Sequence, residues 1–368
     1  MIDVPMNDLT WSPSGLLEAE LSACEDVIRS GWWILGAKVE EFEKRWAAWI
    51  DSRYGVGCAN GLDAIEMGLR AIGVGAGDEV ITTPMTAFAT GLGIIRAGAT
   101  PVLADIQLDT AMLDIDSVKR CITKKTKAIL LVHLYGQIGP VIELRDLANE
   151  HGLQLIEDCA QAHGASLSGV SAGKFGTFAA WSFYPTKNLG AVGDAGALTT
   201  DVANIAESAR VIRNYGQSER YQHPIFGMNS RLDELQAALL LAKIEHLPDW
   251  INRRRQVAKR YAAEIRNEWV ELLPLPDQEE RHSHHLFVIR CRLRNELRDH
   301  LRSRGVATLI HYPIPMHLQE SCRNIKRDSV GLQVSERHGS QCLSLPCHPG
   351  LNSKQVDQVI AATNCFKG

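Results

Sequence analysis

The sequence predicts an α/β protein with a mostly parallel mixed sheet flanked by helices, followed by a smaller C-terminal α+β domain. Between residues 53 and 200, short apolar runs of strand length alternate with amphipathic runs of helical length. This alternation is typical of a parallel sheet covered by helices. After residue 270 the pattern changes to shorter, mixed elements. We therefore expect a large domain over residues 1–250 and a small domain over residues 251–368.

The individual elements follow from hydrophobic periodicity. Two helices are expected near the N-terminus, on either side of an extended WWILG, and the first should have Leu16, Leu17, Leu21 and Val27 on its apolar face. The expected strands are RYGVGCA, DEVITTP, TPVLADI, TKAILLVHLYG, LQLIEDCA, FAAWSFY, GALTT, HHLFVIRC and VATLIHYP. The expected helices include NGLDAIEMGLRAI, TAFATGLGIIRAG, IELRDLANEHG, NIAESARVIRNYG, RLDELQAALLLAKIEHL, a solvated basic INRRRQVAKRYAAEIRNEW, NELRDHLRSRG and VDQVIAATNCF.

Composition excludes several classes of protein. The net charge is -4 with no basic block, which argues against a nucleic-acid partner. The nine cysteines show no metal-ligand spacing, so we expect reduced thiols and no metal site. The N-terminal MIDVPMNDLTWSPSG does not resemble a signal peptide, and no apolar run reaches the length of a membrane span. We expect a cytoplasmic protein that has no membrane partner.

One lysine stands out, in the stretch WSFYPTKNLGAVGDAGALTT. Lys187 lies between an aromatic run and a glycine-rich run that contains no other cation. A partly desolvated lysine has a lowered pKa, and its amine can attack a carbonyl carbon. The alternative is an ordinary lysine in a turn.

Three other features belong at strand ends or helix starts, where ligands bind in such sheets. Asp158 ends a buried strand and needs a partner, which a protonated pyridine nitrogen would provide; capping of the next helix is the alternative. The helix start at Asn60-Gly61-Leu62 could attract a phosphate. Phe88, at the start of another helix, could stack on a planar ring, although an aromatic residue at such a place is more often part of the core.

Other motifs are less informative. GVGAGDEV precedes a strand instead of following one, which excludes a dinucleotide-binding loop. RHSHH lacks metal-ligand spacing. In HYPIPMH, two prolines would aim His311 and Tyr312 in a defined direction.

Taken together, the chain resembles the DegT/DnrJ/EryC1/StrS family of nucleotide-sugar aminotransferases over nearly its whole length. The motifs that carry the resemblance are SGWWILG, ANGLDAIEMGLRAIGVGAGDEVITTP, TKAILLVHLYGQ, EDCAQAHGA, SFYPTKNLGAVGDAGA, GMNSRLDELQAA and SLPCHPGL. The resemblance implies a fold-type-I enzyme that uses pyridoxal 5'-phosphate (PLP), with a Schiff base at Lys187. It also implies that Asp158 pairs with the ring nitrogen and Gln161 with the ring hydroxyl, that Phe88 stacks on the ring, and that Gly61, Leu62 and Ser182 bind the phosphate. Asn229 would reach the phosphate from the neighbouring subunit of a homodimer with shared active sites.

The resemblance also implies the reaction. Relatives with histidine at the lysine position remove a sugar hydroxyl, so Lys187 favours transamination, with glutamate as amino donor. NGLDAI and FYPTKN resemble members that aminate C3 of a dTDP-linked 3-keto-6-deoxyhexose, in deoxysugar and lipopolysaccharide O-antigen biosynthesis. Tyr184 and His311 are expected to line the sugar pocket, with Arg231 as a further contact or as an ion-pair partner of Asp233 or Glu234. The alternatives are a C4 aminotransferase, a PLP-dependent sugar dehydratase and a non-catalytic PLP-binding regulator.

Overall fold

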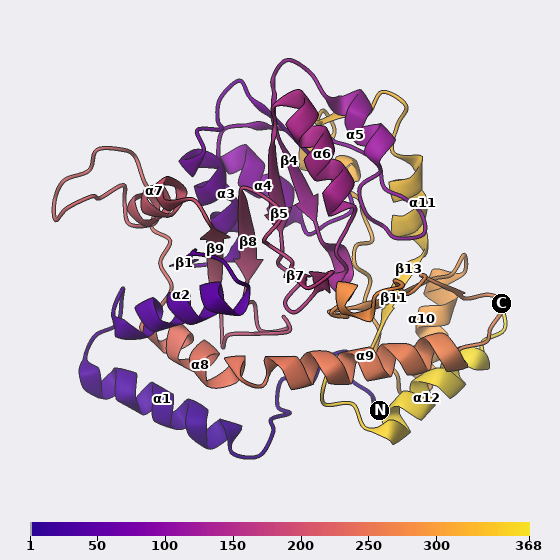
Figure 1. Ribbon diagram of the computed structural model, residues 1–368. Coiled ribbons are helices and arrows are strands. Elements are labelled where there is room, and N and C mark those ends of the chain that lie inside the picture. The colour runs from indigo at the N-terminus through magenta and orange to yellow at the C-terminus, as the bar shows by residue number, and fades with distance from the viewer. Residues whose placement is uncertain (1) are drawn as a thin grey trace.

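The computed structural model describes residues 2–368, which form an eight-stranded sheet between two layers of helices and a smaller sheet beside it (Figure 1). The helices are α1 Leu16–Ser30, α2 Ala37–Trp49, α3 Gly61–Ala71, α4 Phe88–Arg96, α5 Ile115–Cys121, α6 Val141–His151, α7 Ala203–Arg213, α8 Glu234–Ile244, α9 Leu247–Glu264, α10 Arg294–Ser303, α11 Gln333–Gln341 and α12 Ser353–Asn364. The strands are β1 Tyr54–Cys58, β2 Glu79–Thr82, β3 Thr100–Leu103, β4 Thr126–Val132, β5 Gln154–Asp158, β6 Ser166–Leu167, β7 Val170–Ser171, β8 Phe178–Ser182, β9 Gly196–Thr200, β10 Glu271–Leu272, β11 Phe287–Arg290, β12 Lys326–Arg327 and β13 Cys342–Leu345.

The large sheet has the strand order β1-β9-β8-β5-β4-β2-β3-β12. Only the pairs that include β9 are antiparallel, and the other neighbours pair in parallel. Because β1 and β8 are both antiparallel to β9, they run in the same direction as β5, β4 and β2. The carboxyl ends of these five strands therefore lie at one edge of the sheet, and the loops that follow them meet there.

Alternating side chains of the buried strands face two separate hydrophobic cores. In β4, Ile129 and Leu131 pack into the core that contains residues of α2, α6 and α8. Ala128, Leu130 and Val132 pack into the core that contains residues of α3, α4 and α7. This arrangement confirms the prediction that TKAILLV is buried on both faces, as a parallel strand between two helical layers must be.

The small sheet has the order β10-β11-β13 and packs with α9, α10 and α12 around a third core. The predicted fold class, a mostly parallel mixed sheet plus a smaller α+β part, is thus confirmed. Two short segments link the parts: β12 adds to the edge of the large sheet beside β3, and Val4 pairs with Val306. None of the helices in residues 2–368 combines the length and apolar character of a membrane span.

Three predicted features are wrong. Residues 306–313, all of them described, form no strand, and Leu309 makes only one bridge, to Ser344. The segment bridges two different partners, Val4 at Val306 and Ser344 at Leu309, so it builds no continuous ladder, and Pro313 at its end has no N–H group to donate. On α1, Leu16 and Val27 are buried, but Leu17 and Leu21 are exposed. The basic helix α9 is not solvated all round, because it buries one face that includes Arg254.

Candidate active site

The edge where the parallel strands end brings together the helix starts and strand ends that the sequence singles out. α3 begins at Gly61 directly after β1, and Ser182 is the last residue of β8. A Cβ atom at Gly61 would lie 2.8 Å from the Cβ atom of Ser182. Glycine is therefore required for this close approach, which places the amide groups at the start of α3 beside the Ser182 hydroxyl. Backbone N–H donors and a hydroxyl are suited to binding a phosphate.

Asp158 is the buried acidic group of the site. Its Oδ2 atom accepts a hydrogen bond from Thr90 Oγ1 at 2.7 Å, and its Oδ1 atom accepts from the Ala160 N–H at 3.1 Å. Burial raises the pKa of the carboxyl group, while the bonds from Thr90 and Ala160 and the charge of Lys187 oppose this rise. Both hydrogen-bond donors are neutral, so the carboxylate can still pair with a cationic ring nitrogen.

Lys187 lies in a tight turn, and its backbone N–H donates to the Tyr184 carbonyl at 2.8 Å. Burial lowers the pKa of the Lys187 amine to about 8, against a smaller opposing effect of Asp158. His163 and His311 are close enough to be affected by the same amine, and burial lowers their pKa values to about 3 and about 4. The imidazoles near Lys187 are therefore neutral at neutral pH. A larger fraction of the Lys187 amine is in the neutral, nucleophilic form than in an exposed lysine.

Gln161 has its side-chain amide fixed by the backbone. The Tyr135 N–H donates to Gln161 Oε1 at 2.6 Å, so the Nε2 group must point the other way as a donor. Here Nε2 donates to the Tyr312 hydroxyl at 3.1 Å. Burial raises the pKa of Tyr312 to about 12. A donor held in this manner is suited to a ring hydroxyl or phenolate oxygen.

Tyr312 completes this network. The sequence singles out both His311 and Tyr312, but it assigns a place in the pocket to His311 alone. His311 bonds through Nδ1 to Ser344 Oγ at 2.8 Å, and its carbonyl accepts from the Tyr135 hydroxyl at 2.6 Å. The prolines of HYPIPMH were the available signal, but they do not show which of the two side chains meets Gln161.

Most of the other predicted site residues are exposed in the single chain, and Arg231 is half-buried. Phe88 begins α4 and is partly exposed, and Tyr184 is more exposed. Asn229 is exposed at the base of the loop 214–229, which projects from the body of the molecule near α7 (Figure 1). Arg231 does not form the alternative ion pair, because it bonds to Asn214 Oδ1 at 3.0 Å and lies over the Tyr215 ring.

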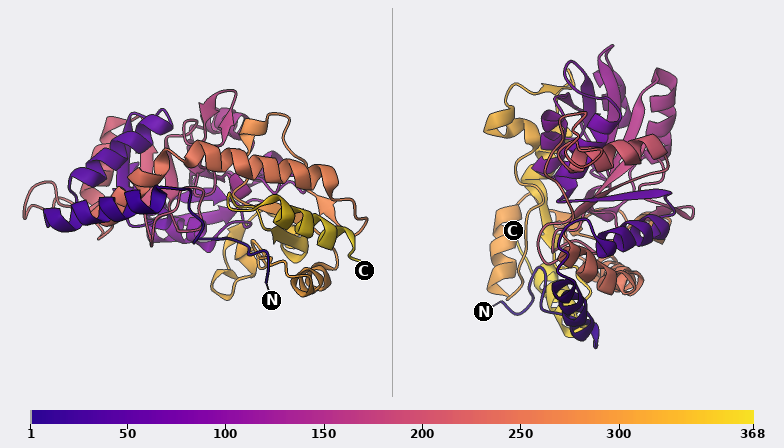
Figure 2. Two further views of the ribbon diagram at one scale, coloured as in Figure 1. Left: turned by 90° about the horizontal axis from the view of Figure 1, so that it is seen from below. Right: turned by 90° about the vertical axis from the view of Figure 1, so that its left-hand side faces the viewer.

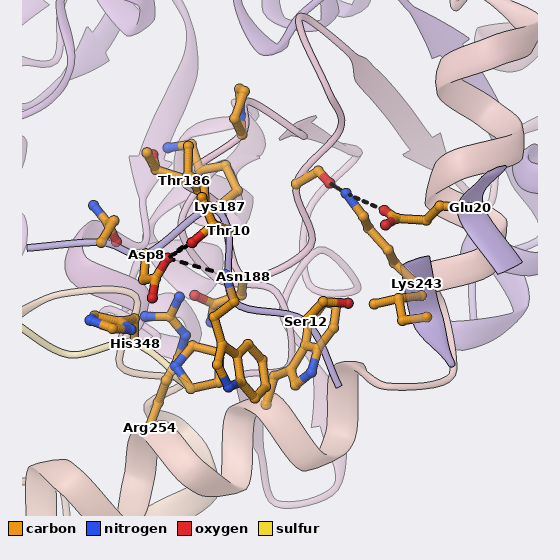
Figure 3. Close-up of a pocket in the computed structure, with 18 of the residues that line it drawn as sticks. Asp8, Thr10, Ser12, Glu20, Thr186, Lys187, Asn188, Lys243, Arg254 and His348 are labelled. Carbon is orange, nitrogen blue, oxygen red and sulfur yellow. Dashed lines mark hydrogen bonds and ion pairs between the residues drawn. The ribbon is translucent and has the colours of Figure 1, made fainter. Parts of the chain in front are cut away.

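A cavity of about 310 Å³ lies between the lysine turn and the N-terminal segment (Figure 3). Arg254 lines it and donates to the carbonyls of His284, His285 and Cys347. Asp8 accepts from both the N–H and the hydroxyl of Thr10, and Lys243 pairs with Glu20 at 3.1 Å. These groups are bonded to one another or to backbone, so they brace the surroundings of the lysine turn.

The donor set fits PLP. Asp158 is a buried carboxylate without a charged hydrogen-bond donor, the Gln161 amide is oriented to donate, and Gly61 lets the start of α3 approach Ser182 closely. A mostly parallel sheet with a lysine of lowered pKa near this carboxylate defines the class of fold-type-I α/β aminotransferases.

Comparison with known proteins gives the family. The model of the DegT/DnrJ/EryC1/StrS aminotransferase family matches residues 16–364, and the chain belongs to this family of PLP-dependent nucleotide-sugar aminotransferases.

Two curated relatives illustrate the range of names in the family. The chain is 43% identical over 344 residues to "dTDP-3-amino-3,6-dideoxy-alpha-D-galactopyranose transaminase" of Aneurinibacillus thermoaerophilus. The match covers 94% of this chain and 94% of the relative. It is 42% identical over 361 residues to "Pleiotropic regulatory protein" of Geobacillus stearothermophilus. This match covers 98% of this chain and 97% of the relative.

Two solved structures show the same fold. Streptomyces venezuelae DesV, in complex with a ketimine intermediate, is 40% identical, with a TM-score of 0.95, 99% coverage of this chain and 98% of that chain. NtdA from Bacillus subtilis, with the bound cofactor PMP, is 30% identical, with a TM-score of 0.90, 99% coverage of this chain and 85% of that chain.

Proposed function

We propose that this protein uses PLP to transfer an amino group from glutamate to C3 of a dTDP-linked 3-keto-6-deoxyhexose. The observation that carries the proposal is the pair of Asp158, a buried carboxylate with neutral donors, and Lys187, an amine with a pKa of about 8. The choice of C3 is supported by the Aneurinibacillus relative, whose name describes a dTDP-3-amino sugar.

Each residue has a proposed role around the cofactor. PLP supplies an aldehyde that an amine can attack and a ring that withdraws electrons. Asp158 would hold positive charge at the ring nitrogen, and Gln161 Nε2 would donate to the ring hydroxyl. Phe88 would cover one face of the ring. The amides of Gly61 and Leu62 and the Ser182 hydroxyl would bind the phosphate, with Asn229 contributed by a second copy of the chain.

Lys187 has two proposed tasks. Its Nζ atom would hold the cofactor covalently until the amino donor takes its place. The freed Nζ atom would then take a proton from the carbon that carries the donor's amino group and pass it to the cofactor, and it would move a proton in the opposite direction when the keto sugar is bound. A positioned base of this kind contributes about 10²–10⁴-fold to the rate. Tyr184 and His311 would contact the sugar.

The test is a spectroscopic and chemical assay. Protein loaded with PLP should show a visible absorption band that disappears when glutamate is added. dTDP-, UDP- and GDP-linked keto sugars are then offered separately, and the products are identified by mass spectrometry. Amination at C3 of the dTDP sugar supports the proposal, whereas amination at C4 would reassign the position.

One alternative has an observation in its favour. The Geobacillus relative is named a pleiotropic regulatory protein, so a non-catalytic PLP-binding regulator is the second candidate. A band that glutamate does not bleach, with no sugar aminated, would identify the regulator. A dehydratase is disfavoured by Lys187. The Lys187→Ala variant should keep its fold and lose covalent PLP, and turnover by this variant would contradict the mechanism.

A further inference from the structure

Two threonine hydroxyls lie in series beside the carboxylate of Asp158. Thr90, near the start of α4, donates from Oγ1 to Asp158 Oδ2 at 2.7 Å, and Thr86 Oγ1 lies 2.8 Å from Thr90 Oγ1. Thr86, Thr90 and Asp158 are only 7%, 1% and 5% exposed. The hydroxyl pair is therefore shielded from water and faces the one carboxylate that the proposed function assigns to the cofactor ring.

The direction of both hydrogen bonds follows from the chemistry. An ionised carboxylate only accepts, so Thr90 must donate to Asp158. A threonine has a single hydroxyl proton, so the bond between the two threonines must run from Thr86 to Thr90. Each donor is thus polarised toward the carboxylate, which strengthens the pair and favours the charged form of Asp158.

The other groups around Asp158 do not replace this pair. On β5 and the loop after it, the Ala160 N–H donates to Oδ1 at 3.1 Å. Lys187, from the turn after β8, and His133, which follows β4, act on the Asp158 carboxyl group through their charge. Tyr312 feels the Asp158 charge, but its hydroxyl is bonded to Gln161. After burial, the Thr90 bond is the largest single influence on the pKa of Asp158, and it lowers it.

We infer that Thr90, supported by Thr86, is a positioning residue that keeps Asp158 ionised and fixes the rotation of its carboxylate toward the ring nitrogen of PLP. This inference rests on the proposed function. Neutral donors are the suitable choice, because an arginine or lysine at this place would pair with Asp158 and remove its need for a cationic ring. Phe88 and Thr90 lie two positions apart on α4 and do not share a face. The same helix can therefore place Phe88 against the ring and Thr90 against the Asp158 carboxylate.

Four variants test the inference. Thr90→Val removes the donor while preserving shape, Thr90→Ser retains it, and Thr86→Val removes the second hydroxyl. Thr200→Val is the matched control, because Thr200 is also buried and donates to a backbone carbonyl, that of Thr177, at 2.8 Å. Each protein is examined for its PLP dissociation constant, for the pH midpoint of the bound chromophore and for its thermal unfolding.

For Thr90→Val we expect a dissociation constant roughly tenfold higher, from the loss of one bond to a charged group. The pH midpoint of the chromophore should rise. Less positive charge on the ring raises the pKa of the Lys187 nitrogen that is joined to PLP. Thr90→Ser should restore both values, and Thr86→Val should shift them in the same direction by less. Thr200→Val should lower only the unfolding temperature.

The outcomes separate the inference from the proposed function. If the wild-type protein binds PLP and Thr90→Val has the same midpoint and affinity, the inference is wrong and the proposed function stands. If the wild-type protein does not bind PLP, the proposed function fails. The hydroxyl pair is then judged in the cofactor-free protein by the ¹³C chemical shift of the Asp158 carboxyl, whose pKa Thr90→Val must raise. Should Thr90→Val not fold, an unshifted Thr86→Val midpoint overturns the inference.

Discussion

At the scale of single residues, Lys187 combines burial with a reactive amine. Its pKa of about 8 arises mainly from desolvation, which disfavours the ammonium form, and Asp158 limits the shift. Only the neutral amine attacks an aldehyde, so the rate of PLP capture by cofactor-free protein should rise with pH, with a midpoint near 8. Rapid-mixing absorbance at several pH values measures this rate.

Asp158→Asn provides the control for that experiment. The aspartate favours the charged lysine, so its removal should move the midpoint of capture to lower pH. A wild-type midpoint close to the ordinary lysine value of about 10.4 would show that the amine is fully hydrated instead.

The same scale shows how far residue-level prediction can go. Lys187 and Asp158 were predictable because their chemistry conflicts with their apolar surroundings in the sequence. The orientation of the Gln161 amide was not, because it depends on the Tyr135 N–H and on Tyr312, 151 positions further along the chain. Contacts of this kind leave no local pattern. The roles proposed for the other predicted site residues, such as Tyr184, stay predictions.

At the scale of elements, helix α2 is capped by a residue from another helix. Gly36, its N-cap, has no side chain, and the Glu234 carboxylate accepts from the N–H groups of Gly36, Lys38 and Val39 at 2.8, 3.0 and 2.9 Å. Glu234→Ala should therefore destabilise the fold by about 2–3 kcal/mol, because three helix-start donors, of which the Val39 N–H is buried, lose a charged acceptor. Urea unfolding measures the change. Glu207→Ala, at an exposed position of α7, should have almost no effect.

The end of β5 contains a second structural carboxylate, next to Asp158. Glu157 accepts from the N–H groups of Gly173, Phe175 and Gly176 and bonds to His133 Nε2 at 2.9 Å. Glu157→Gln replaces an acceptor by a donor that faces other donors, and a loss of about 1–3 kcal/mol is expected. Equal unfolding free energies for this variant and for the exposed Glu150→Gln would contradict this role.

The sequence predicted elements best where periodicity is strong and burial is complete, as in β4 and α3. It failed where tertiary contacts decide the structure. β12 has two residues and is a strand only because β3 lies beside it. Residues 306–313 have the apolar content of a strand, but they bridge two different partners, at Val306 and Leu309, and His311 and Tyr312 lie in a loop at the site.

At the scale of the whole molecule, the two parts of the chain are interlocked. Val4 pairs with Val306 in the C-terminal part, whereas β12 joins the large sheet. Arg254 of α9 donates to the carbonyls of His284 and Cys347, at the end of the small sheet where β11 begins and β13 ends. The division into residues 1–250 and 251–368 stays a prediction. The N-terminal segment pairs with the C-terminal part, and β12 of the C-terminal part belongs to the large sheet.

The single chain also exposes large aromatic side chains at places far from its cores. Trp32 and Trp33 follow α1, which lies along an outer edge of the molecule, and Tyr221 and Phe226 lie on the projecting loop 214–229 (Figure 2). Phe226 is 95% exposed. Exposed groups of this size are typical of protein interfaces, and they support the proposed homodimer in which Asn229 completes the site of the other copy.

Hybrid dimers test this sharing of residues. In a dimer of one Lys187→Ala chain and one Asn229→Ala chain, sharing between copies gives one site with both lesions and one site with neither. The mixture should therefore regain up to half of the wild-type activity per hybrid, although each variant alone is impaired. If Asn229 acts within its own chain, every site in the hybrid has one lesion, and mixing restores nothing. Differently tagged chains, refolded together and purified on both tags, provide the hybrid. The Glu207→Ala chain paired with Lys187→Ala is the control, and it should give half activity in either case.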